Sequence, residues 1–210
     1  MNTATARRFA TPRGSGAQRA ADGRVVLLNK PYGVLCQFSA DASGKPTLAD
    51  FVHLPDIYPA GRLDADSEGL VVLTADGVLQ ARITSPRRKL AKVYWVEVEG
   101  LPAPAQMAAL AAGVDLGDFV TAPALARAIR EPPSLWPRVP PIRFRKAIPT
   151  SWLELTLTEG KNRQVRKMTA YVGFPTLRLI RVRIGKHAMT DLAPGAWKVL
   201  SPGERRLVLS

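Results

Sequence analysis

Short segments rich in branched aliphatic residues recur along the chain, and Pro, Gly and polar clusters separate them. They read RVVLLN at 24–29, LVVLT at 70–74, LAKVYWVEVE at 90–99, WLELTLT at 152–158 and RLIRVRI at 178–184. Short length and β-branched content are typical of strands rather than of buried helices. In the last segment the alternation places Arg181 and Arg183 together on one exposed face.

Helical patterns lie between these strands. We expect a helical turn at 48–52, an amphipathic helix between Asp76-Gly77 and Ser85-Pro86, an Ala-rich helix at 104–112, and a basic helix from Gln164 to Gly173 with Asn162 as its N-cap. Strands and helices that alternate irregularly predict an α+β fold. We expect a mixed, largely antiparallel sheet with flanking helices.

The chain divides into two parts by composition. Residues 1–23 carry several Arg among Ala, Gly, Thr and Ser without apolar periodicity, which predicts a mobile basic tail. Residues 24–210 then form the folded domain. Within it the Pro-rich span 131–149 resists regular structure, and its Trp and Arg residues favour contact with a partner, Arg143 and Arg145 among them.

The charge of the chain favours a polyanionic partner. There are 30 Lys and Arg against 17 Asp and Glu, a net charge of +13, and nucleic acid is the first candidate.

Other classes of protein are disfavoured by the sequence. No apolar run is long enough to span a membrane, and the N-terminus lacks the charged and then apolar segments of a secretory signal, so we expect a cytoplasmic protein. One Cys and two His leave the chain poor in the ligands that zinc prefers, so no zinc mechanism is expected. Ser43-Gly44-Lys45 departs from a phosphate loop at Ser39 and Pro46, so no nucleotide cofactor is expected.

The densest chemical pattern is AGRLDADSEGLVVLTADG at 60–77, in which Asp64, Asp66 and Glu68 crowd into a loop before a buried strand. A calcium loop would need a bidentate acid where Ala75 stands, and would be followed by a helix rather than a strand. A solvated turn explains Asp66 and Glu68 but not an acid directly after Arg62-Leu63. Asp64 is therefore the candidate nucleophile or base, provided that a cation keeps it ionised.

Two further patterns supply partners for this acid. KNRQVRKM at 161–168 places cations on a turn and a helix, where they could reach a carboxylate or RNA phosphates, although a merely solvated helix face fits the same pattern. In the strand at 90–99, Lys92, Tyr94 and Val96 share one face. Tyr94 could stack on a nucleobase or could be an ordinary packing aromatic.

From about Arg24 to Leu209 these motifs resemble the RsuA/RluB/RluE/RluF family of pseudouridine synthases. The segment 60–77 resembles the catalytic signature of that family, NKPYG at 29–33 its opening motif, Lys92-Val93-Tyr94 its KxY element, and EGKNRQVRKM its third motif. Only a short basic tail stands ahead of NKPYG in the sequence, so we expect no S4-type RNA-binding domain of the kind that many members carry. Together with KPTLADF and the run from Trp136 to Trp152, this is similar to the members that act on the large ribosomal subunit.

The resemblance implies a pseudouridine synthase catalytic fold in two subdomains and a reaction without a cofactor. It implies that Asp64 is the nucleophile, that Tyr94 packs against the target base, and that a basic residue pairs with Asp64, Arg166 being favoured over Arg163. The substrate would be a uridine of 23S ribosomal RNA, free or in an assembling large subunit, and the protein a monomer. The RNA-binding residues would be Arg62, Lys92, Lys161, Asn162, Arg163, Gln164, Lys167, Arg143 and Arg145, with no metal ligand.

Two other functions remain open from the sequence. A non-catalytic RNA-binding or ribosome-assembly protein would use the same basic surface, and a pseudouridine synthase acting on another RNA, such as tRNA, would use the same chemistry. Each predicts RNA binding that weakens with salt. Only an enzyme requires an acid placed beside an arginine.

Overall fold

The structure is a computed structural model that describes residues 23–133, 135–142, 148–189 and 191–206. Its longer strands are β1 (Val25–Lys30), β3 (Glu68–Thr74), β4 (Lys92–Glu99), β5 (Leu125–Ile129), β6 (Thr150–Leu157) and β7 (Thr176–Ile184). Short strands are β2 (Tyr58–Pro59), β8 (His187–Ala188) and β9 (Trp197–Val199). The helices are α1 (Gly77–Thr84), α2 (Pro104–Ala112), α3 (Gln164–Tyr171) and α4 (Pro202–Arg206), with 3-10 turns η1 (Leu48–Asp50) and η2 (Pro86–Arg88).

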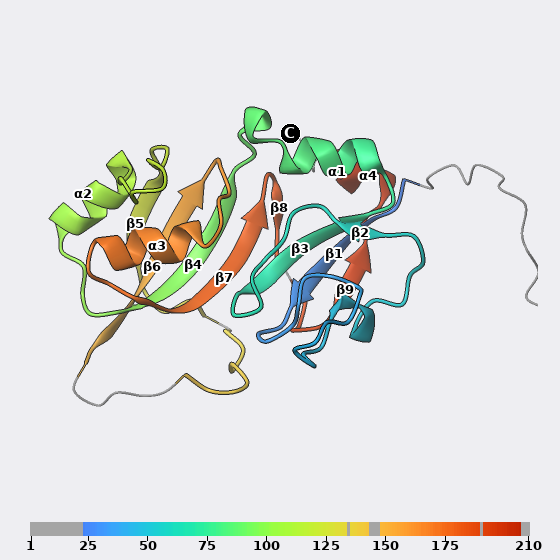
Figure 1. The fold of residues 1–210 in the computed structure, drawn as a ribbon, viewed down its shortest axis with the longest axis horizontal. Coiled ribbons are helices and arrows are strands. Elements are labelled where there is room, and N and C mark those ends of the chain that lie inside the picture. The colour runs from blue at the N-terminus through green and yellow to red at the C-terminus, as the bar shows by residue number, and fades with distance from the viewer. Residues whose placement is uncertain (1–22, 134, 143–147, 190, 207–210) are drawn as a thin grey trace, which may run out of the picture.

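All these strands join one sheet of order β5-β6-β4-β7-β3-β1-β9, with β2 on β3 and β8 on β7 (Figure 1). Every pairing is antiparallel except that of β3 with β7, which is parallel and spans only Glu68–Ile180 and Gly69–Arg181. Two antiparallel halves therefore meet at a short junction. Gly69 is required there, because a Cβ on it would lie 2.3 Å from the carbonyl oxygen of Arg181.

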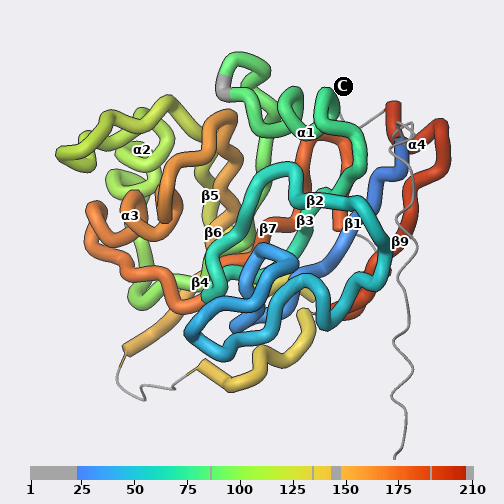
Figure 2. The backbone as a smooth tube through the Cα atoms, turned by 45° about the vertical axis from the view of Figure 1, so that its right-hand side comes forward, coloured from blue at the N-terminus to red at the C-terminus, as the bar shows by residue number. Residues whose placement is uncertain are grey.

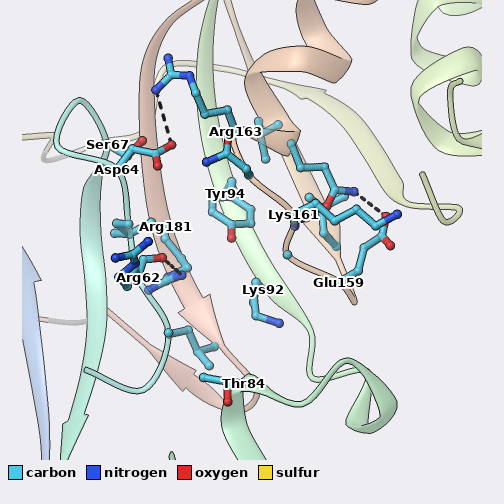
Figure 3. Close-up of a pocket in the computed structure, with 18 of the residues that line it drawn as sticks. Arg62, Asp64, Ser67, Thr84, Lys92, Tyr94, Glu159, Lys161, Arg163 and Arg181 are labelled. Atoms are coloured by element: carbon cyan, nitrogen blue, oxygen red, sulfur yellow. Dashed lines mark hydrogen bonds and ion pairs between the residues drawn. The ribbon is translucent and has the colours of Figure 1, made fainter. Parts of the chain in front are cut away.

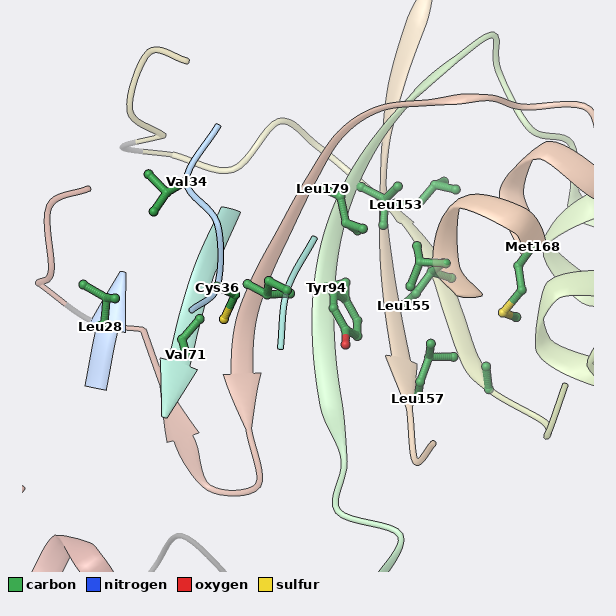
Figure 4. Close-up of a cluster of buried hydrophobic side chains, with 14 of the residues drawn as sticks. Leu28, Val34, Cys36, Val71, Tyr94, Leu153, Leu155, Leu157, Met168 and Leu179 are labelled. Atoms are coloured by element: carbon green, nitrogen blue, oxygen red, sulfur yellow. The ribbon is translucent and has the colours of Figure 1, made fainter. Parts of the chain in front are cut away.

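Apolar side chains cover both faces of the sheet. On one face, a large cluster runs from β1 and β3 across Tyr94 to the β6 leucines and to Met168 of α3 (Figure 4). On the opposite face, Ile83 of α1 packs on β1 and β3, and a separate cluster forms around Trp152 and Ile180. The strand β3 is buried along its whole length, which explains why its central residues 70–73 are continuously apolar rather than alternating.

The α+β class, the largely antiparallel sheet and the flanking helices are confirmed. The five expected strands correspond to β1, β3, β4, β6 and β7, and the expected helices to η1, α1, α2 and α3. The sequence did not predict β5, whose LARAI sequence is poor in β-formers and which pairs only with β6 at the edge. The strands β2, β8 and β9 are too short to carry a periodic pattern.

Two local expectations were wrong. Arg181 is buried, whereas Arg183 is exposed. A register shift against β4 pairs Arg181 with Tyr94 and Arg183 with Val93, so that the two arginines lie on opposite faces. The N-cap of α3 is Arg163 in a left-handed conformation, and no side chain caps the helix. Asn162 therefore precedes the cap instead of forming it.

Several expectations fall wholly or partly outside the described residues. The proposed tail lies there almost entirely, as do Arg143 and Arg145. The described part of the Pro-rich span has no helix or strand, as expected, and in Figure 2 it passes in yellow beside the segment that follows β1. Among the described residues, no helix has the length and apolar character needed to cross a membrane.

Candidate active site

Asp64 lies on the loop between β2 and β3, at the junction of the two halves of the sheet. The preceding Leu63 is buried, and the carbonyl of Asp64 accepts a hydrogen bond from the backbone N–H of Ser67 at 3.0 Å. The Asp64 side chain remains 37% exposed. A tight turn between Leu63 and Ser67, which are both buried, thus presents this carboxylate to solvent.

Two arginines of the third motif reach this loop. Arg163 contacts Asp64, with Nη1 at 3.6 Å from Oδ2, and makes a closer, two-point contact with Asp66 at 2.9 and 3.2 Å. Arg166, which the sequence favoured as the partner of Asp64, instead donates to the carbonyl of Asp66 at 2.6 Å and lies 3.4 Å from its carboxylate. The ion pair to Asp64 therefore comes from Arg163.

The carboxylate of Asp66 is held in the charged form. Partial burial alone would raise its pKa, but the hydrogen bond from Arg163 and the charges of Arg166 and Arg163 outweigh that effect and lower the pKa. Asp66 therefore offsets one of the two positive charges that the arginines bring to the loop.

The NKPYG motif also holds the loop that carries Asp64, through hydrogen bonds to its backbone. The Nζ of the fully buried Lys30 donates to the carbonyls of Pro31 and Val34 at 2.8 Å and lies 3.5 Å from that of Ala65. Gly33 N–H donates to the carbonyl of Ala65 at 2.7 Å. Burial lowers the pKa of Lys30 to about 8. Lys30 was not among the predicted site residues, although it belongs to the NKPYG motif.

A pocket of about 380 Å³ opens beside Asp64 and extends between β4, β7 and the start of α3 (Figure 3). Tyr94 and Lys92 line it from β4, and Leu179 and Arg181 line it from β7. Tyr94 is only 7% exposed and also packs in the core. Packing of Tyr94 in the core is thus confirmed, and because part of the ring also borders the pocket, stacking on a nucleobase stays a prediction.

Lys92 and Arg181, the cations that line the pocket from β4 and β7, differ in their environments. Burial, and then the charge of Arg181, lower the pKa of Lys92, whose Nζ donates to the carbonyl of Leu90 at 2.9 Å. Arg181 donates through Nε to the carbonyl of Leu70 at 2.8 Å and through Nη1 to that of Arg62 at 3.4 Å. Arg181 thereby connects β7 to the loop of Asp64. Sequence patterning missed it because the strand appeared to expose it.

The remaining predicted residues are only partly brought together. Arg62, Lys161, Asn162, Arg163 and Gln164 line the pocket, although Gln164 is buried and donates to Glu159. Lys167 points elsewhere, to Asp118 at 2.6 Å. Among the described residues, no three His, Cys, Asp or Glu side chains converge in a way that could hold a metal ion.

Comparison with known proteins gives a consistent picture. The sequence profile of the family described as RNA pseudouridylate synthase matches residues 24–171. Ribosomal large subunit pseudouridine synthase E of Vibrio vulnificus is 54% identical over 181 residues, which are 86% of this chain and 76% of that protein. The protein of the same name from Xanthomonas campestris is 58% identical over 177 residues, 83% of this chain and 94% of that one. A crystal structure of a pseudouridylate synthase superposes with a TM-score of 0.74 at 30% identity, covering 90% of this chain and 75% of the other.

Proposed function

The chain belongs to the RNA pseudouridylate synthase family, and we propose that it converts one uridine of large-subunit (23S) ribosomal RNA to pseudouridine, with Asp64 as the nucleophile. Enzymes of this family isomerise uridine to pseudouridine. The observation that carries the residue assignment is the exposed Asp64 carboxylate, paired with Arg163, at the edge of a pocket bordered by Tyr94. The names of the relatives support the choice of RNA.

The reaction exchanges one bond to the ribose for another. The bond between N1 of uracil and C1′ breaks with its electron pair going to N1, and the Asp64 carboxylate attacks C1′. The uracil then rotates, its C5 forms a bond to C1′ and displaces the carboxylate. The proton lost from C5 balances the one gained at N1. The isomerisation is redox-neutral and consumes no co-substrate.

The other residues have supporting roles in this proposal. Arg163 places a positive charge beside Asp64, and Arg166 fixes the loop through the Asp66 carbonyl. Tyr94 stacks on the flipped base and assists proton movement. The RNA contacts expected at Arg62, Lys92, Lys161, Asn162 and Lys167, and those expected at Arg143 and Arg145, stay predictions. We further expect residues 24–210 to act as a monomeric catalytic unit in the cytoplasm, on free or assembling 23S rRNA.

The test maps pseudouridine by mass spectrometry in large-subunit rRNA from cells with the protein, without it, and with variants. One site should disappear without the protein, and Asp64→Asn should lower the rate of its formation by on the order of 10⁴-fold while leaving RNA affinity unchanged. Asp76→Asn is the matched control, because Asp76 caps α1 outside the pocket and Asn caps equally well. Product formed by purified Asp64→Ala protein would refute the assignment, and a protein that binds RNA but alters no uridine would be a non-catalytic assembly factor.

A further inference from the structure

A second cavity, also of about 380 Å³, lies next to Asp64 and is separate from the pocket of Tyr94. Its walls include Tyr32 and Lys45 from the segment after β1, together with Asp64, Asp66 and Arg163. Asp64 and Arg163 line both cavities. The catalytic carboxylate of the proposed function therefore stands between two spaces, and only one of them is needed for the target base.

The aromatic wall of the second cavity is held in place. Tyr32 is half-buried, and the guanidinium of Arg138 lies 4.3 Å from the centroid of its ring. Arg138 in turn donates to the carbonyls of Pro140 and Pro141 at 2.9 and 3.1 Å. A fixed ring backed by a guanidinium favours stacking by a nucleobase, because little ordering is left to occur on binding.

The Pro-rich loop that carries Arg138 is itself attached to β3 and β7, next to the loop of Asp64. The indole N–H of Trp136 donates to Glu68 at 2.8 Å, and the carbonyl of Trp136 accepts from Arg178 at 2.9 Å. This loop was expected to make contact with a partner. In the structure its position places Arg138 on Tyr32, which connects the loop to the cavity beside Asp64.

The charges around the cavity suit a phosphodiester. Lys45 and Arg163 contribute positive charge, and the two acids of the wall are both paired: Asp66 with Arg163 and Arg166, and Asp64 with Arg163. Lys45 is therefore the cation of this wall that is left to meet a phosphate. An aromatic ring beside two cations is the combination that proteins use to bind single-stranded nucleic acid. A small anion without an aromatic ring would leave Tyr32 without a partner, and a neutral apolar ligand would leave the cations without one.

We propose that this second cavity binds the nucleotide adjacent to the target uridine, with its base stacked on Tyr32 and its phosphate beside Lys45 and Arg163. The proposal rests on the proposed function, since it takes Asp64 as the residue that meets C1′ of the target. A phosphodiester joins the target sugar to each neighbour. One neighbouring nucleotide must therefore lie close to Asp64 whenever the target base occupies the pocket of Tyr94.

The experiment compares Tyr32→Leu, Tyr32→Phe and Lys45→Gln with the control Tyr171→Leu, which alters a tyrosine that is 61% exposed on α3 and lines neither cavity. The probe is unmodified large-subunit rRNA transcribed in vitro, titrated with each protein in single-turnover conversion and in binding at several salt concentrations. Tyr32→Leu should raise the half-saturating concentration about tenfold without changing the salt dependence, whereas Tyr32→Phe should match the wild type. Lys45→Gln should make the slope of log affinity against log salt shallower by about 0.7.

A fragment with an abasic nucleotide on either side of the mapped uridine completes the test. On one side the missing base should weaken the wild type about tenfold and leave Tyr32→Leu unaffected. Equal behaviour of Tyr32→Leu and Tyr171→Leu, or a Tyr32→Phe protein as weak as Tyr32→Leu, would overturn the stacking proposal. Such a result leaves the activity of the wild type intact, whereas loss of the proposed function would show as wild-type protein that makes no pseudouridine.

Discussion

The buried ion pair of Glu68 and Arg178 allows a quantitative prediction about the junction of the sheet. Glu68 follows the catalytic loop and is the first residue of β3, and Arg178 lies on β7. The guanidinium bonds both carboxylate oxygens, at 2.8 and 2.9 Å, and the two side chains are 2% and 6% exposed. Trp136 adds a third hydrogen bond to Glu68 at 2.8 Å.

Replacing Glu68 by Gln retains the shape of the side chain but leaves the charge of Arg178 buried without its partner. Removing one member of a buried pair costs about 3–5 kcal/mol. We expect the lower end of this range, because the charge of Arg178 also acts on the partly buried Glu97, which offers a second carboxylate. For a domain of this size, about 3 kcal/mol corresponds to a fall in Tm of roughly 6–12 °C.

Thermal and urea unfolding of the purified protein measure this effect. The matched control is Glu154→Gln, because Glu154 bonds Arg127 and the indole of Trp95 in the same manner but at the surface, where the side chain of Arg127 is 69% exposed. That variant should lose less than about 1 kcal/mol. The double variant Glu68→Met with Arg178→Met should be more stable than either single Met variant. Additive losses in the double variant, or a Tm for Glu68→Gln within 2 °C of the control, would refute the reasoning.

Two further predictions concern the support of the catalytic loop. Burial lowers the pKa of Lys30 to about 8. Between about pH 8 and pH 10.5 the unfolded chain therefore holds a proton that the folded chain has lost, so the free energy of unfolding rises with pH by up to about 3 kcal/mol. Urea unfolding should show that Lys30→Met lacks this rise, and identical pH profiles of the two proteins would contradict the reasoning. Gly69→Ala should cost about 4 kcal/mol from overpacking against Arg181 and from its φ of +101°. Gly44→Ala, with a positive φ but open space around it, should lose only about 1 kcal/mol in the same assay, and equal losses would show that the close approach at Gly69 is unimportant.

Local pattern was sufficient for the strands and helices that form the core. The continuous apolar run of β3 indicates burial on both faces, and the alternation of β4 and β6 indicates which face of each is buried; both patterns are visible in the sequence. The same reasoning failed at Arg181, because the register shift between β4 and β7 reverses the face on which that residue lies. A shift of this kind depends on a partner strand distant in the sequence.

The site was predictable to a similar extent. The position of Asp64 follows from an acid in a Gly-bounded loop before a buried strand, but the choice between Arg163 and Arg166 does not follow from the sequence. Both lie near the start of α3, where Arg163 adopts a left-handed conformation with φ of 51°. That backbone conformation, which sets the direction of the chain at the start of the helix, is not visible in the sequence. Lys30 was missed for a different reason, since a lysine is expected at the surface unless a distant loop supplies carbonyl acceptors.

Basic side chains from separate elements hold the catalytic loop through its backbone rather than through Asp64. The carbonyls of Arg62, Ala65 and Asp66 are contacted by Arg181, Lys30 and Arg166, respectively. A carbonyl is neutral, so these contacts fix the loop without consuming the charge of the nucleophile. Several close cations on Asp64 itself would hold its lone pairs and weaken its attack on a sugar carbon. The contact from Arg163, at 3.6 Å, places one positive charge beside the carboxylate while leaving it available to react.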